Sequence, residues 1–242
     1  MTQKLYAMGD IHGQREMLEG ALSLIEADGG RDARIVFLGD YVDRGPDSKG
    51  VIEILAQGVA EGRNWTCIKG NHDRLFEWFV TPPHPRNDPH LIIGYDWTHP
   101  NIGGRETMQS YGIEVPERIR SKELADEVRA KVPDHHLTFL NGLKLSHREA
   151  GKFFVHAGVR PGVPLADQVE DDMVWIRDEF LKDTRDHGAL VVHGHTPVDA
   201  PELHANRLNL DTGAGKGHPL SVAVFEGEEI SILRESGRVR LG

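Results

Sequence analysis

Five glycine-flanked polar motifs, each placed directly after a short apolar run, constrain the fold of this chain more than any other feature. The apolar runs have the length and composition of buried strands and are Leu5–Met8, Arg34–Leu38, Trp65–Lys69, Lys152–Val155 and Ala189–Val192. The motifs that follow them are Gly9–Gly13, Gly39–Gly45, Gly70–Asp73, His156–Gly158 and His193–Thr196. Because open α/β sheets bind ligands outside the carboxyl ends of their strands, we expect the five motifs to meet at one site.

The segments between the first three runs carry apolar residues at helical spacing. In one segment these residues are Met17, Leu18, Ala21, Leu22 and Ile25, and in the other they are Val51, Ile52, Ile54 and Leu55. We expect Asp47 or Ser48 to cap the second helix and Gly58 to end it. The alternation of strand and helix predicts a βαβαβ unit with a parallel sheet.

The rest of the chain is predicted to mix helices with an antiparallel meander. A third helix is expected after Asn71, ending near Pro82 and Pro83, and an irregular excursion over 81–101 follows it. Further helices are predicted over Ser121–Lys131 and Pro133–Leu140. The glycine-separated runs of the last third predict antiparallel strands at Leu208–Leu210, Leu220–Phe225 and Ile230–Leu233. We expect one domain spanning residues 1–242.

Composition excludes several classes of protein. A formal net charge of −10 argues against a dedicated nucleic-acid or anionic-membrane surface. The single cysteine, Cys67, rules out an internal disulfide and is expected to be a buried thiol. No apolar stretch has the length of a membrane span, and the first residues lack the apolar core of a signal peptide. The expected location is the cytoplasm.

The side chains that the motifs offer are carboxylates, imidazoles and one carboxamide, without a thiolate. This set suits Mn, Fe or Zn, and two carboxylates crowded with imidazoles at one site require a compensating cation. Two such ions close together form a template for in-line attack on phosphorus. Any one motif alone is adequately explained as a helix cap or a turn. Five in series at strand ends favour a metal-dependent phosphoester hydrolase.

The five motifs, in this order, resemble those of the phosphoprotein phosphatase family of calcineurin-like metallophosphoesterases, in particular its small bacterial and phage members. The resemblance runs from Met8 to about Phe225 and includes Met173–Arg177 and Leu210–Ala214. It implies an α/β fold in which mixed parallel and antiparallel sheets form a four-layer sandwich with flanking helices. It also implies a dinuclear site with two divalent ions, Mn²⁺ being expected and Fe or Zn being alternatives.

The resemblance assigns two groups of residues. The expected metal ligands are Asp10 and His12 for the first ion, Asn71, His156 and His195 for the second ion, and Asp40 as the bridge between the two. The expected catalytic residues are His72, Asp43, Arg44 and Arg177.

Each catalytic residue has an expected task. His72 is expected to be the general acid that protonates the leaving alkoxide, and Asp43 to orient it and keep it protonated. Arg44 and Arg177 are expected to grip the phosphoryl oxygens with their planar guanidinium groups.

The activity that the resemblance implies is that of a serine/threonine protein phosphatase, with phosphotyrosine as a further substrate class. Hydrolysis of the phosphomonoester would proceed by direct attack of a metal-bridging hydroxide. Expected substrates are phosphoproteins, phosphopeptides or small phosphoesters, and no obligatory regulatory subunit is expected. The alternative is a nucleotide hydrolase that resembles the symmetrical diadenosine tetraphosphatases. Those enzymes lack the second acidic residue of the second motif, so Asp43 and the short spacing from His156 to His195 favour the phosphatase.

Some residues near the motifs have weaker claims to function. His193 is expected to lie in the core rather than to bind metal, and Asp73 is explained by its place in the first turn of a helix. Asp211 is expected to shape the floor of the site. Tyr95 and Trp97 in the excursion are expected either to line the rim of the site or simply to pack.

Overall fold

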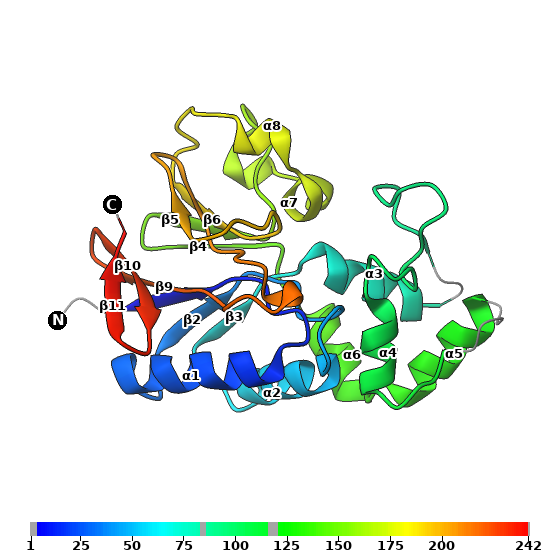
Figure 1. The fold of residues 1–242 in the computed structure, drawn as a ribbon. Helices are drawn as coiled ribbons and strands as arrows, with labels where there is room; N and C mark the ends of the chain where they lie inside the picture. The colour runs from blue at the N-terminus through cyan, green and yellow to red at the C-terminus, as the bar shows by residue number, and fades with distance from the viewer. Residues whose placement is uncertain (1–3, 83–85, 116–120, 242) are drawn as a thin grey trace.

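The computed structural model describes residues 4–82, 86–115 and 121–241, which form two stacked β-sheets with helices outside each sheet (Figure 1). The first sheet has the order β11-β10-β9-β1-β2-β3. Its strands are β1 (Leu5–Met8), β2 (Arg34–Phe37), β3 (Trp65–Cys67), β9 (Val222–Glu226), β10 (Glu229–Arg234) and β11 (Gly237–Arg240). The second sheet has the order β4-β5-β6-β8-β7. Its strands are β4 (Ser146–Glu149), β5 (Lys152–Val155), β6 (Leu190–His193), β7 (Glu202–Leu203) and β8 (Arg207–Asn209).

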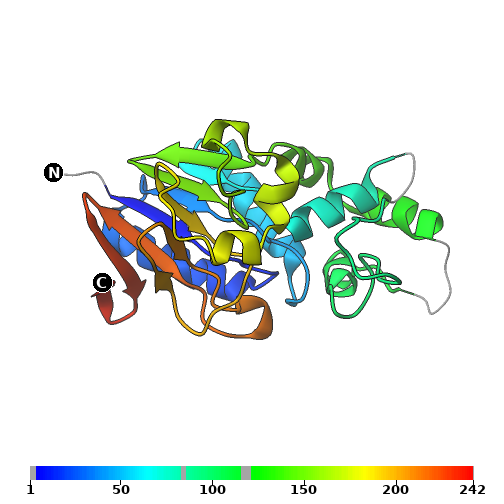
Figure 2. The same cartoon turned by 90° about the horizontal axis from the view of Figure 1, so that it is seen from above.

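The helices complete the outer layers and one end of the molecule (Figures 1 and 2). Helices α1 (Arg15–Gly29) and α2 (Ser48–Ala60) cover the first sheet, and the short helices α7 (Glu170–Trp175) and α8 (Asp178–Leu181) cover the second. The remaining helices gather beside the sheets and are α3 (Asn71–Val80), α4 (Gly104–Ser110), α5 (Ser121–Lys131) and α6 (Asp134–Asn141). The predicted four-layer sandwich is therefore confirmed. None of the helices described is long and apolar enough to cross a membrane.

The alternation of side chains along the first strands explains why two layers pack on the same sheet. In β1, Leu5 and Ala7 lie in the apolar layer between the sheets, whereas Tyr6 and Met8 lie in the cluster under the helices. The strand β2 divides in the same way, with Val36 between the sheets. Strands of this kind are buried on both faces, which is why they read as continuous apolar runs.

Parallel pairing brings the polar motifs to common sheet edges. In the first sheet β1 pairs with β2 and β2 with β3, all parallel. In the second sheet β5 pairs with β6 and β6 with β8, again parallel. The predicted βαβαβ unit is present.

Two details of the sequence prediction were wrong. Gly58 does not end α2 but lies inside it. A glycine is needed there because an added Cβ would lie 1.9 Å from the Trp65 ring. The antiparallel meander contains only β9, β10 and β11, whereas β8 joins the second sheet parallel to β6. A short apolar run does not specify its partner, and Leu208 is buried between the sheets beside β6.

The other helices either agree closely with the prediction or have no recognisable pattern in the sequence. Asp47 caps α2 by accepting the amide of Gly50 at 2.8 Å, and α5 has the predicted bounds. The helix α3 ends at Val80, and Pro83 lies outside the described residues. The helix α4 was not predicted, since it begins at Gly104, the second of two glycines in a polar segment.

Candidate active site

The six predicted metal ligands lie together in the interior of the molecule. Each follows a strand of the two parallel sets, and each is between 0% and 5% exposed. They are Asp10, His12, Asp40, Asn71, His156 and His195. Such a set of buried carboxylates and imidazoles is stable only with compensating interactions.

Strained backbone marks the same place. Six non-glycine residues of the described chain have positive φ, and five of them are predicted site residues: His12, Asp40, Asp43, Arg44 and His195. The left-handed region is costly for residues with a Cβ, and such conformations persist where the surrounding structure imposes them. Here the turns after β1, β2 and β6 aim the functional side chains at one point.

Two motif glycines are required by close approach to the site carboxylates. A Cβ on Gly70 would lie 2.1 Å from Oδ1 of Asp40, and a Cβ on Gly194 would lie 2.0 Å from Oδ1 of Asp10. Neither carboxylate could keep its position beside a larger residue. The glycines of the third and fifth motifs therefore allow Asp40 and Asp10 to enter the site.

The donor atoms of the predicted second metal site face one another. The Oδ1 atom of Asn71 lies 2.8 Å from Nδ1 of His195 and 3.0 Å from Nε2 of His156. Nε2 of His156 lies 3.4 Å from Oδ1 of Asp40. Two ligands of a tetrahedral ion are separated by about 3.3–3.4 Å when each bond is about 2.0–2.1 Å. The spacing fits a divalent ion with only small adjustments.

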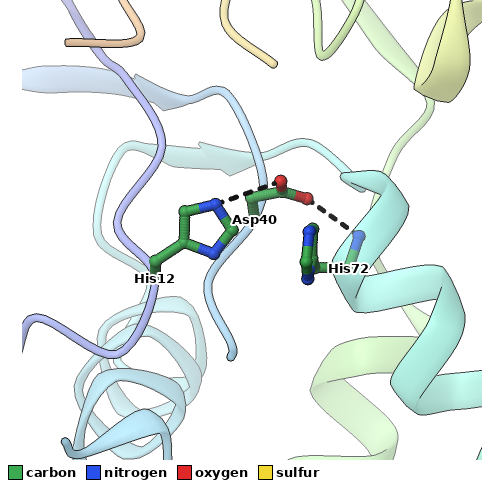
Figure 3. Close-up of side chains that lie close together, drawn as sticks. All are labelled: His12, Asp40 and His72. Carbon is green, nitrogen blue, oxygen red and sulfur yellow. Dashed lines mark hydrogen bonds and ion pairs between the residues drawn. The ribbon is translucent and has the colours of Figure 1, made fainter. Parts of the chain in front are cut away.

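The other oxygen of Asp40 faces His12. Its Oδ2 lies 3.4 Å from Nε2 of His12, and its Oδ1 accepts the amide N–H of His72 at 2.9 Å (Figure 3). The side chains of Asp40, His12 and His72 form one group that could hold an ion, and Asp40, His156 and His195 form another. Asp40 belongs to both groups, as expected of a bridging ligand, and that role stays a prediction.

The electrostatics of the carboxylates point to the same requirement for positive charge. Burial, together with Asp211 and Asp40, raises the pKa of Asp10 well above its usual range. Burial would also raise the pKa of Asp40, but His156 and the other nearby histidines outweigh it and lower the pKa. Carboxylates in these surroundings favour a bound cation.

Asp10 takes a different position from the other predicted ligands. It belongs to neither of the two groups, and its carboxylate accepts the amide N–H of His195 at 3.1 and 3.2 Å. The contact ties the first motif to the last. Its role as a ligand remains a prediction.

The predicted acid His72 is held by the predicted orienting residue Asp43. Nδ1 of His72 lies 2.7 Å from Oδ2 of Asp43, whose side chain is fully buried. Two residues of the excursion and α4 complete this arrangement. Trp97 donates its indole N–H to both carboxylate oxygens at 3.0 Å, and Thr107 donates to Oδ1 at 2.8 Å. Trp97 is 2% exposed, so it packs beneath the site rather than lining its rim.

The two predicted phosphate-gripping arginines both reach the site. Arg44 donates to Nε2 of His12 at 2.8 Å and to Nε2 of His72 at 2.9 Å. Arg177 donates to the carbonyl of His195 and to Thr196. In this arrangement Arg44 is hydrogen-bonded to Nε2 of His72, the atom from which a proton would be transferred.

Asp73 forms hydrogen bonds that the sequence did not indicate. Its carboxylate accepts amide N–H groups from Gly70 at 2.8 Å, Asp40 at 2.8 Å and Tyr41 at 2.9 Å. Burial and the nearby Asp40 raise the pKa of Asp73 to about 8 in spite of these three donors. The side chain joins the second motif to the third, a contact between residues more than thirty positions apart that no local pattern signals.

The remaining weaker assignments have simple packing explanations. His193 is fully buried beside Phe180 and belongs to neither ligand group. Asp211 accepts the amide N–H of Gly213 at 2.9 Å and thereby shapes the turn beneath the site.

The excursion is attached to the site by a buried ion pair that the sequence did not reveal. Arg74 donates to Asp88 at 2.6 and 2.9 Å, and both side chains are at most 3% exposed. Asp88 also accepts the indole N–H of Trp175 at 3.0 Å, and the Trp175 ring lies edge-on to His195 at 5.8 Å. The excursion therefore contacts elements on both sides of the site.

Comparison with known proteins agrees with this geometry. The family model described as calcineurin-like phosphoesterase matches residues 3–219. The bis(5'-nucleosyl)-tetraphosphatase PrpE of Oceanobacillus iheyensis, of the asymmetrical type, is 26% identical in an alignment that covers 93% of this chain and 90% of that protein. Serine/threonine-protein phosphatase 2 of Escherichia coli is 24% identical, with 90% of each chain covered.

A solved structure shows the same fold. The cold-active protein-tyrosine phosphatase of a psychrophilic Shewanella species superposes with a TM-score of 0.64 at 14% identity, covering 100% of this chain and 81% of that one. The family model spans most of the chain, and the buried donor atoms suit divalent ions. The chain therefore belongs to the calcineurin-like phosphoesterase family and is a hydrolase of the metallophosphoesterase type.

Proposed function

We propose that this protein hydrolyses bis(5'-nucleosyl) tetraphosphates at a dinuclear metal site. The observation that carries the substrate class is the end-to-end similarity to an asymmetrical bis(5'-nucleosyl)-tetraphosphatase. Asp43 and the short spacing from His156 to His195 favour a protein phosphatase over a nucleotide hydrolase of the symmetrical type. The relative that matches this chain from end to end is of the asymmetrical type, so we propose the nucleotide substrate ahead of the phosphoprotein.

The proposed metal ligands are those brought together by the five motifs: Asp10, His12, Asp40, Asn71, His156 and His195. Two divalent ions bound there would supply positive charge to the phosphate oxygens and acidify a water as the nucleophile. We expect Mn²⁺, with Fe and Zn as alternatives, because oxygen and imidazole donors accept all three.

His72 is the proposed proton donor to the leaving group. Asp43 holds Nδ1 of His72, which leaves Nε2 as the atom that delivers the proton. Arg44 must move away from Nε2 for this transfer, and a phosphate group offers its guanidinium a better acceptor than an imidazole. Arg177, which donates to the carbonyl of His195 and to Thr196, would also bind phosphate.

The two substrate classes place different demands on His72. When phosphoserine is hydrolysed, the leaving group is the strongly basic alkoxide of the serine side chain, whereas hydrolysis of a dinucleoside tetraphosphate releases a weakly basic nucleoside phosphate. Protonation of the leaving group therefore matters much more for the phosphopeptide than for the dinucleotide. A serine/threonine protein phosphatase is the second candidate function, favoured by the buried pair of Asp43 and His72 and by the similarity to protein phosphatase 2.

The test is a comparison of turnover on diadenosine tetraphosphate, phosphoserine and phosphotyrosine peptides and p-nitrophenyl phosphate, each with Mn²⁺, Fe²⁺, Zn²⁺ and Mg²⁺. We expect the highest kcat/KM on the dinucleotide, and chromatography of the nucleotides should show ATP and AMP. Formation of two ADP would assign the symmetrical cleavage instead. A phosphopeptide preferred over the dinucleotide with every metal would overturn the proposal in favour of the protein phosphatase.

A further inference from the structure

A third group of possible metal ligands lies between α2 and α6, separate from the two groups that share Asp40. It consists of Glu53 on α2 with His135 and His136 in the first turn of α6. Oε2 of Glu53 lies 3.1 Å from Nε2 of His135 and 2.9 Å from Nε2 of His136. Two imidazoles from adjacent residues thus converge on a single carboxylate oxygen of another helix.

We propose that Glu53, His135 and His136 form a binding site for a divalent transition-metal ion of the zinc type. The inference does not depend on the proposed function. The donor set of two imidazoles and one carboxylate is one that zinc accepts, with water completing the coordination. The nitrogen-to-oxygen distances of 2.9 and 3.1 Å are slightly below the separation of about 3.3–3.4 Å between ligands of a tetrahedral ion, so a small rotation of exposed side chains suffices.

The buried member of the group is prepared for metal binding by a neighbour. The side chain of His136 is fully buried, and its Nδ1 lies 2.8 Å from the hydroxyl of Tyr111. When that hydroxyl accepts the Nδ1 proton, Nε2 presents its lone pair toward Glu53. Metal-binding histidines characteristically have the second ring nitrogen held in this way.

The other two ligands give access to the ion. The side chains of Glu53 and His135 are 48% and 56% exposed, and both line a cavity of about 580 Å³ whose other lining residues include Phe139 of α6. An ion can therefore enter from solvent without unfolding either helix. The positive end of the α6 dipole disfavours a cation, so the carboxylate of Glu53 is essential to the site.

An isolated pair elsewhere on the surface supplies the matched control. His204 and Glu202 lie 3.4 Å apart on the far sheet edge, with similar exposure and no place in any ligand group of the described residues. If the first cluster were only a hydrogen-bonded ion pair, the two places would behave alike toward metal.

The test is equilibrium dialysis of the full chain against micromolar Zn²⁺, with zinc counted per chain by atomic emission. We expect the unsubstituted protein and His204→Gln to retain one more equivalent of zinc than Glu53→Gln and His135→Gln. The affinity for that equivalent should fall at least about 100-fold in the two site variants, because a ligand is lost outright. Both variants alter exposed side chains, and turnover with saturating Mn²⁺ should stay unchanged.

Zinc should also raise the melting temperature through the link between α2 and α6, and this increment should be smaller in Glu53→Gln. Equal zinc content in all four proteins would overturn the proposal. Loss of the extra equivalent in His204→Gln as well would do the same, since it would indicate unspecific surface binding.

Discussion

The strand-end motifs and the excursion over residues 81–101 serve the same site in different ways. The motifs supply the groups that would touch metal and phosphate, and they are aimed by strained turns at the ends of parallel strands. The excursion supplies Trp97 and Asp88, which touch other protein groups instead. The chemical groups of the site therefore come from short local sequences, whereas the residues that hold those groups in place are distant in the sequence. Four substitutions test this division.

Asp40→Asn should have the largest effect. Asp40 belongs to both ligand groups, so its loss should abolish binding of both ions. We expect activity to fall by more than about 10⁴-fold together with loss of bound Mn²⁺. Metal content and turnover are measured on the same sample, with the exposed Asp167→Asn as control. Retention of two ions would show that Asp40 is not a bridging ligand.

His72→Asn should separate catalysis from metal binding. With a phosphoserine peptide we expect turnover to fall by ~10²–10⁴, the usual size of a general-acid contribution, and by less with diadenosine tetraphosphate. Metal content should not change. The structure also places His72 in a group that could hold an ion, so a lost equivalent of metal would assign it as a ligand instead. His204→Asn is the matched control.

Asp88→Asn should act on stability more than on chemistry. The substitution leaves the buried charge of Arg74 without its main partner, and we expect the free energy of unfolding to fall by about 3 kcal/mol. Urea unfolding measures the change. Asp171→Asn removes the exposed partner of the same arginine and should cost less than about 1 kcal/mol. Similar losses in both variants would refute the special importance of the buried pair.

Trp97→Phe should have the smallest effect of the four. It removes the indole donor to Asp43 but keeps the ring between Phe76 and Phe79. We expect kcat on the phosphopeptide to fall roughly tenfold, about the value of one hydrogen bond to a charged group, with KM unchanged. Trp78→Phe on the neighbouring helix is the control. An unchanged kcat would mean that Thr107 alone holds Asp43 in place.

The main features of the fold could be predicted from the sequence because each one produces a local pattern of apolar, polar and glycine residues. The strands Leu5–Met8 and Lys152–Val155 have the predicted bounds, since continuous apolar runs of that length are buried on both faces of a parallel strand. The glycine-flanked motifs predicted a common site, since parallel strands end at the same edge. The donor types of Asp40, Asn71 and His156 predicted a site for divalent ions, and the buried donor atoms suit such ions.

Only the tertiary structure decided the contacts between polar side chains that are distant in sequence. Trp97 meets Asp43 across 54 positions, and Glu53 meets His136 across 83. The tertiary structure also decided that β8 pairs with β6 rather than with the meander, because a short apolar run does not specify its partner strand. Burial of apolar surface produces a periodic signal along the chain, but one hydrogen bond between two distant side chains produces none. The sequence by itself therefore determined the chemistry available at the site, and packing decided what holds that chemistry in place.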